Sequence, residues 1–440
     1  MLARNEDRKL PMNHHASAVR PFDAALLGDI RARFLHVDFC PIVKQRRVFL
    51  ESGGGSLKLK TAIDAATEVS GLPDQEGRDN DASRYLSAVL NKGREDLRLF
   101  FGSGSAGQVV SGETGTELLY KFIRNAALNA PPGPVLSSNL EHPASFDAAR
   151  QWAEYTGRAW REVDLDPLSG TVRPEDYAAA MTPDTRIATV IHTSQLTGFR
   201  VDLEGIVKAI RAVAPECYVI VDGIQQAPHG DIDVLAYGAD AYVFSPYKTY
   251  SRLAVGFGWV SDRLSDVRHD HMLSKSPRLW ELGSRDPGIY AAQTAVTDYL
   301  AWLGGQSGGS GDRGALVRAG TEAMAAQERA LVALLLDGEA GVPGLLDMPG
   351  IAVIGPRALA ERAGIVSFTL RGVPSPEIVR QLADRQIRVH ARIDDGYSGH
   401  ILAALDLPDC VRVSLCHYNS PDEIRLLLTE MAALAKAHGG

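Results

Sequence analysis

Short apolar runs separated by polar turns recur along this 440-residue chain. Two of them, Tyr218–Val221 and Ala241–Phe244, have the length and side-chain content of buried parallel strands. Segments with apolar residues at helical spacing, such as DAALLGDIRARFL and DEIRLLLTEMAALAKAH, lie elsewhere in the chain. This mixture predicts an α/β fold, in which a ligand binds at the carboxyl ends of the parallel strands.

Both runs end in residues that can carry chemistry. Asp222 and Gln225 follow the first run, and Ser245 and Lys248 follow the second. Pyridoxal phosphate needs a lysine that holds it as a Schiff base and an acid that keeps its pyridine nitrogen protonated. These residues alone fit such a site. They fit equally well an ordinary strand–helix unit with a solvated lysine and a helix-capping aspartate.

The stretch VDGIQQAPHGDIDVLAYGADAYVFSPYKTY resembles the lysine segment of class V aminotransferases, the cysteine desulfurase-like family of pyridoxal phosphate enzymes of fold type I. Residues at matching positions are Asp222, Gln225, His229, Ser245 and Lys248, whereas Tyr247 replaces the usual histidine. The resemblance implies a large domain with a mainly parallel seven-stranded sheet between helices, and a small C-terminal α/β domain. The predicted parts are an N-terminal arm and helix (1–47), the large domain (48–314), a linking helix (315–337) and the small domain (338–440).

The resemblance also implies roles for individual residues. Lys248 would carry the cofactor and then take the substrate's α-proton, Asp222 would hold the pyridine nitrogen, and His142 would stack on the ring and relay protons. Arg412 would hold the α-carboxylate of an amino acid, and Gly54 would lie beside it. The further cofactor-binding residues implied are Gly115 and Thr116 at a helix start that favours phosphate, Gln195, Gln225, Ser245, Tyr247, and Ser284 reaching across a homodimer.

One part of the family pattern is missing. Desulfurases carry a nucleophilic cysteine on a loop of the small domain, and the corresponding position here falls near Asp395. Because that cysteine is missing, we do not expect persulfide chemistry. The four cysteines (Cys40, Cys217, Cys410 and Cys416) stand at no metal-like spacing, so we do not expect a metal site either. The polar stretch with His390, Arg392, Asp394 and Asp395 is expected as a loop, either facing an acidic substrate or simply exposed.

The sequence therefore predicts an enzyme that acts at the α and β carbons of a small α-amino acid. The expected route runs through a Lys248 aldimine and a quinonoid or enamine intermediate, in a lyase or decarboxylase that can join the product to an aldehyde co-substrate. The segment GSRDPGIYAA resembles one in the isopenicillin N epimerase-like members of the family. The chain is also similar to the decarboxylating members that join their product to an aldehyde. An epimerase, a desulfurase and an aminotransferase stay open as alternatives. Intact Asp222, Gln225 and Lys248 argue against a non-catalytic relative.

Composition and charge limit the partners and the cellular compartment that we expect. The net charge of -8 argues against a nucleic-acid partner, and 45% apolar with 23% charged residues is typical of a soluble enzyme. No apolar run approaches the roughly 20 residues that span a bilayer, and the N-terminus lacks an apolar signal region. We expect a cytoplasmic homodimer with reduced thiols and no membrane contact.

Overall fold

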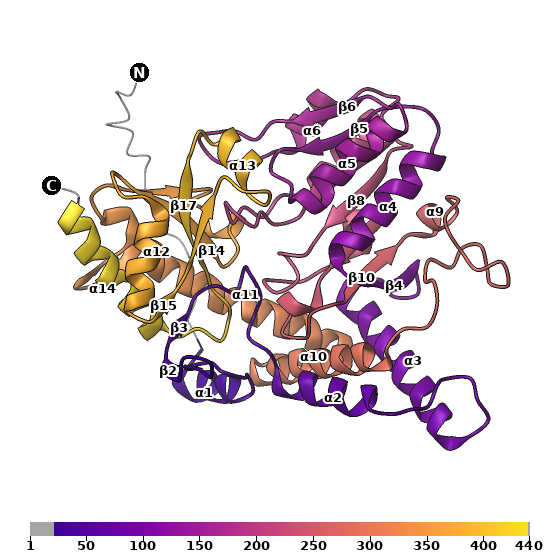
Figure 1. Ribbon diagram of the computed structural model, residues 1–440, viewed down its shortest axis with the longest axis horizontal. Coiled ribbons are helices and arrows are strands. Elements are labelled where there is room, and N and C mark those ends of the chain that lie inside the picture. Colours follow the sequence, from indigo (N-terminus) through magenta and orange to yellow (C-terminus); the bar gives the residue numbers. More distant parts are fainter. Residues whose placement is uncertain (1–21, 439–440) are drawn as a thin grey trace.

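The computed structural model describes residues 22–438, so the arm expected over residues 1–20 lies outside the described residues. Its largest sheet has seven strands (Figure 1). In spatial order they are β4 (Gln108–Gly112), β10 (Gly256–Val260), β9 (Ala241–Phe244), β8 (Tyr218–Asp222), β7 (Ile187–Ile191), β5 (Val135–Ser138) and β6 (Trp160–Val163). Only β10 runs antiparallel to its two neighbours; all other pairs are parallel. This confirms the predicted fold class.

Helices cover both faces of this sheet, which explains why its strands are apolar throughout. Ile220 of β8 packs in a buried cluster with α4 (Gly115–Asn129) and α5 (Pro143–Tyr155). Its neighbours Val219 and Val221 pack in the opposite cluster, formed with the remaining large helices. Those helices are α2 (Lys60–Ser70), α3 (Asp81–Phe101), α7 (Leu203–Val213) and α10 (Pro287–Gln306).

A second sheet is built by the C-terminal part of the chain. It is antiparallel, in the order β13 (Ile351–Ile354), β14 (Ile365–Leu370), β17 (Asp409–Ser414) and β16 (His390–Ile393). It shares a core with α11 (Arg313–Asp337), α12 (Ser375–Asp384) and α14 (Pro421–His438). The N-terminal strand β3 (Val48–Phe49) joins this part by pairing with β15 (Ile387–Arg388). Helix α1 (Ala24–Ala32) and the hairpin of β1 (Phe39–Cys40) and β2 (Gln45–Arg46) precede it.

The glycine-rich stretch 304–315 is helical at both of its ends and non-helical over residues 307–312. Helix α10 runs to Gln306 and α11 begins at Arg313. A Cβ on Gly304 would lie 2.0 Å from the Leu316 carbonyl oxygen, and one on Gly320 would lie 2.1 Å from that of Leu300. These glycines are therefore needed where two helix backbones touch, not where the chain turns. Among residues 22–438, no helix is both long and apolar enough to span a membrane.

Candidate active site

Lys248 lies just after β9, in the short 3₁₀ turn Pro246–Lys248, and only 7% of it is exposed. Its Nζ makes no hydrogen bond or ion pair with any residue in 22–438, and it lies 5.7 Å from the centre of the Tyr247 ring. Burial, and then the positive charge of Arg412, lower the pKa of Lys248 to about 7. The amine is therefore free and close to half neutral near pH 7, as a nucleophile or base requires.

Asp222 ends β8, the strand next to β9, and is 2% exposed. One carboxylate oxygen accepts a hydrogen bond from the Ile224 backbone N–H at 3.0 Å. Burial raises the pKa of Asp222 to about 6, against the opposing effects of that hydrogen bond and of Lys248. No ion pair joins Asp222 to Lys248 among the described residues, so both charged groups stay available to a third partner.

Two buried amides have polar atoms without partners. Gln225 donates from Nε2 to the Gly53 carbonyl oxygen at 2.8 Å, whereas its Oε1 has no partner. Gln195 is 3% exposed, and neither its Oε1 nor its Nε2 has a partner. A buried amide without hydrogen bonds is costly, by roughly 1–3 kcal/mol per group. These orphaned atoms, beside a free lysine and a free carboxylate, fit a polar ring such as that of pyridoxal phosphate.

A phosphate fits at the start of α4. Thr114 caps this helix by accepting the Glu117 N–H at 3.0 Å, which leaves the first N–H groups of Gly115 and Thr116 without helical partners. A Cβ on Gly115 would lie 2.5 Å from the Ser245 hydroxyl oxygen. Glycine is therefore required for Ser245, which is three residues before Lys248, to reach this helix end.

His142 caps α5, and its Nδ1 accepts the Ala144 backbone N–H at 3.1 Å. The ring proton must then sit on Nε2. Burial, followed by the charge of Lys248, lowers the pKa of His142 to about 3, so the ring is neutral at pH 7. Tyr397, from the turn after β16, places its ring 6.1 Å from that of His142. A neutral, flat, apolar-faced ring suits stacking on a cofactor.

Arg412 reaches the site from β17 and is 2% exposed. Its Nη1 donates to the Gln195 carbonyl oxygen at 3.1 Å, whereas its Nε has no partner. A Cβ on Gly53 would lie 3.2 Å from Arg412 Cζ, and one on Gly54 would lie 3.8 Å from its Nη2. The absence of side chains at these glycines thus leaves space for the guanidinium. Burial lowers the pKa of Arg412 to about 10, which leaves it charged at pH 7.

The structure therefore gathers most of the predicted site residues, with Tyr247 beside Lys248. Its carbonyl accepts a hydrogen bond from Lys58 at 2.7 Å, and its ring would be 3.4 Å from a Cβ on Gly55. Ser284 is not part of this group. It is exposed in a segment where Arg285 pairs with Glu113 at 2.6 Å.

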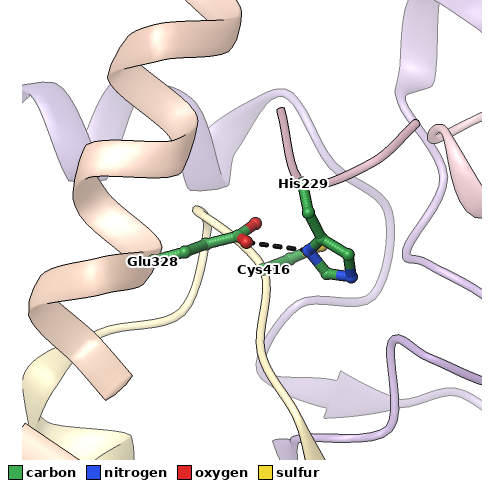
Figure 2. A group of neighbouring side chains, drawn as sticks. All are labelled: His229, Glu328 and Cys416. Carbon is green, nitrogen blue, oxygen red and sulfur yellow. Dashed lines mark hydrogen bonds and ion pairs between the residues drawn. The ribbon is translucent and has the colours of Figure 1, made fainter. Parts of the chain in front are cut away.

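His229 matches the lysine motif, but the structure places it in a separate contact. Its Nδ1 lies 2.7 Å from the Glu328 carboxylate of α11, close to Cys416 (Figure 2). The three side chains offer ligand atoms within 4.8 Å of one another. However, two tetrahedral ligands about 2.0 Å from an ion would be roughly 3.3 Å apart. The shorter His229–Glu328 distance is that of a hydrogen bond tying the β8 end to α11.

Some residues of the site were not found from the sequence. The Glu141 carboxyl, next to His142, is buried and accepts the Ile191 N–H at 2.7 Å, and burial raises its pKa to about 8. Burial lowers the pKa of Lys58 to about 8. The stretch expected as a loop with Arg392 is instead the strand β16, and only residues after Ile393 turn. The alternation of HARI was the available signal for this strand.

Comparisons with known proteins agree with this geometry. The sequence model of the aminotransferase class-V family matches residues 48–275 and 314–427. The chain is 26% identical to the aminotransferase-like protein FGM3 of Gibberella zeae, over 92% of this chain and 97% of that protein. It is 25% identical to a cysteine desulfurase of Klebsiella pneumoniae, over 90% and 95%. The solved structure of the cysteine desulfurase CsdA from Escherichia coli has a TM-score of 0.76 at 20% identity, covering 94% of this chain and 99% of that one.

Proposed function

The chain belongs to the class-V aminotransferase family of pyridoxal phosphate-dependent enzymes, and from that premise we propose that it transforms a small α-amino acid at its α or β carbon. The proposed reaction class is that of a lyase or decarboxylase that works without a cysteine nucleophile. The observation that carries this proposal is the meeting of Lys248, Asp222 and Arg412 in one buried site, in a chain whose four cysteines are all buried.

The chain's own residues would hold the cofactor at four points. Lys248 would offer its free amine, Asp222 would pair with the ring nitrogen, Gln195 and Gln225 would offer their unpartnered amide atoms, and the start of α4 would receive the phosphate. When bound, pyridoxal phosphate supplies an electron sink for the bonds at the substrate's α carbon. His142, neutral and protonated only at Nε2, would cover the ring without adding charge.

Substrate binding and proton movement fall to Arg412 and Lys248. A guanidinium can donate two parallel hydrogen bonds to a carboxylate, and Arg412 has most of its donors free. It would orient the α-amino acid by its carboxylate. Lys248, with its pKa lowered to about 7, can hold a proton at Nζ or release it near neutral pH.

A desulfurase reaction is not favoured, because a sulfur-transferring cysteine must be exposed as a thiolate on a mobile loop. All four cysteines are buried. Burial raises the pKa of Cys410 to about 12 and raises that of Cys416 further. Asp395 and Tyr397 occupy the turn after β16 instead. No observation favours an aldehyde co-substrate, so the proposal concerns the amino acid alone.

We further propose a homodimer with active sites at its interface. Ser284 lies in an exposed segment after β10 whose large apolar side chains face solvent in the single chain. They are Met272, Leu273, Leu279 and Leu282. An exposed apolar surface of this kind is typical of a protein interface, and a partner covering it would bring its own Ser284 segment with it.

The test is a panel of L-amino acids mixed with cofactor-loaded protein, with the visible absorbance and the product masses recorded. We expect at least one amino acid to change the spectrum and to give a product that has lost carbon dioxide or a β substituent. The Arg412→Gln variant should lose this response for every amino acid while keeping the cofactor. Absence of any spectral change across the panel, or sulfide from cysteine as the fastest reaction, would contradict the proposal.

A further inference from the structure

A second arginine of the C-terminal sheet lies at the site without a partner. Arg392 is on β16 and is 8% exposed. Its guanidinium takes part in none of the hydrogen bonds or ion pairs found among residues 22–438, and its Nε is fully buried without an acceptor. A buried guanidinium normally pairs with an anion or with carbonyl oxygens, because its desolvation is otherwise uncompensated.

Arg362 shows what a purely structural buried arginine looks like in this protein. It is 3% exposed, and it donates hydrogen bonds to four carbonyl oxygens. These belong to Pro356, Thr197, Ile365 and Ile354, at distances of 2.7–3.1 Å. Arg392 is nearly as buried and makes none of these contacts, so packing alone does not account for it.

The strand register puts Arg392 on the face of the sheet that carries Arg412. His390 pairs with Arg412 and Arg392 pairs with Cys410, so Arg392 is the diagonal neighbour of Arg412. Diagonal neighbours on one face are about 7–8 Å apart at their α carbons, within reach of two long side chains and one small molecule. The charge of Arg392 also acts on Lys248 and on His142, whose pKa values it lowers.

The charged residues around the site could accept a substrate that carries more than one negative group. Asp395 is the carboxylate whose charge acts most on Arg392, but its side chain accepts a hydrogen bond from the Tyr397 N–H at 2.8 Å and forms no ion pair with Arg392. Glu51 acts on Arg412 and lies 3.5 Å from His390. An α-carboxylate on Arg412 would still leave Arg392 without an anion.

We propose that Arg392 binds a second acidic group of the substrate, so that the enzyme acts on an acidic α-amino acid. The ligand class is an α-amino acid with a carboxylate, or a similar acid group, at the end of a short side chain. Arg412 holds the α-carboxylate and Arg392 holds the side-chain acid, which fixes the α and β carbons beside Lys248. This inference rests on the proposed function, since it assigns a substrate class to the same site.

The experiment compares pairs of ligands that differ only in the side-chain charge. Cofactor-loaded protein is titrated with L-aspartate and with L-asparagine, and binding is followed by absorbance. It is also titrated with succinate, which has no amine to react, and binding is followed by calorimetry and by the melting temperature of the protein. We expect aspartate to bind about 10- to 100-fold more tightly than asparagine, as the loss of charged hydrogen bonds would predict. Succinate should raise the melting temperature.

Variants separate the roles of the arginines. Arg392→Met should abolish the preference for aspartate and the succinate effect while keeping asparagine binding, whereas Arg412→Met should weaken both amino acids. Arg385→Met is the matched control, because the Arg385 side chain is 69% exposed and its one ion pair within residues 22–438 is with Glu430, at 3.6 Å. It should leave every value unchanged. Arg392→Lys, which keeps the charge and loses the paired donors, replaces Arg392→Met if that variant does not fold, and should reduce the preference.

Two kinds of failure can be told apart. If aspartate and asparagine bind equally to the unaltered protein, or if Arg392→Met and Arg392→Lys keep the preference, the acidic-substrate inference is wrong while the proposed function stands. If no amino acid of the panel changes the spectrum of loaded protein, the proposed function itself is wrong, and the inference falls with it.

Discussion

At the residue scale, the site depends on ionisable groups whose pKa values are shifted by burial. For Lys248 the pKa is lowered to about 7 by burial and by Arg412, so protonation removes the nucleophile below pH 7. Cofactor uptake by the cofactor-free protein should therefore rise roughly tenfold per pH unit up to pH 7 and level off above pH 8. Stopped-flow absorbance measures this rate.

The charge of Arg412 provides the control for this prediction. Because that charge lowers the pKa of Lys248, Arg412→Gln should raise it and move the whole uptake profile to higher pH. An uptake rate that keeps rising past pH 9 in the unaltered protein would mean that Lys248 has an ordinary lysine pKa.

A separate prediction concerns Asp222. A carboxylate facing the ring nitrogen keeps the ring able to accept electrons, so Asp222→Ala should lower kcat by about 10²-fold or more. Asp222→Glu, which keeps the acid but displaces it, should lose less. Steady-state kinetics at saturating cofactor gives the values, and release of the cofactor by denaturation checks its occupancy. Turnover close to that of the unaltered protein with full occupancy would show that Asp222 has no such role.

The residues that sequence patterns identified here share one property. Lys248, Asp222 and Arg412 each stand at a strand, inside a recognisable motif. Arg392 has a comparable position but no motif, and nothing in the sequence tells a buried unpaired arginine from an exposed one. His229 shows the opposite case: it matches the motif, yet its nearest charged partner is Glu328, far away in the sequence.

At the element scale, β17 carries Arg412 and ends two residues before Cys416. Cys410 is on the strand itself, and neither thiol is exposed. Buried thiols of this kind act as small apolar groups, so Cys410→Ala and Cys416→Ala should each keep kcat/KM within about threefold. Amino-acid turnover measures this. Loss of turnover in either variant, with folding and cofactor binding intact, would show that a cysteine takes part in the reaction.

Elements were predicted well where the local pattern is strong and badly where tertiary contacts decide. The apolar runs of β8 and β9 are buried on both faces, and their sequence shows it. By contrast, β16 alternates polar and apolar residues because one of its faces turns to the site, and it was expected as a loop. Gly304 and Gly320 let α10 and α11 touch, a contact that no local pattern reveals.

At the scale of the whole molecule, the exposed apolar segment near Ser284 predicts a dimer. Leu273 is 96% exposed there, whereas Leu168, 93% exposed, lies in a turn elsewhere. If the segment is an interface, Leu273→Arg should shift the protein towards monomer and lower its activity, because a buried charge at an interface is costly. Leu168→Arg should change neither. Sedimentation velocity with parallel activity assays distinguishes them, and a fully active monomer would exclude shared active sites.

The most direct test of the central claim is borohydride trapping followed by peptide mass mapping. Loaded protein is reduced with and without a reactive amino acid. We expect the reduced cofactor on Lys248 when no amino acid is present, and on the amino acid, with Lys248 unmodified, when one is present. Reduced cofactor on another residue, or label that stays on Lys248 with every amino acid tested, would contradict it.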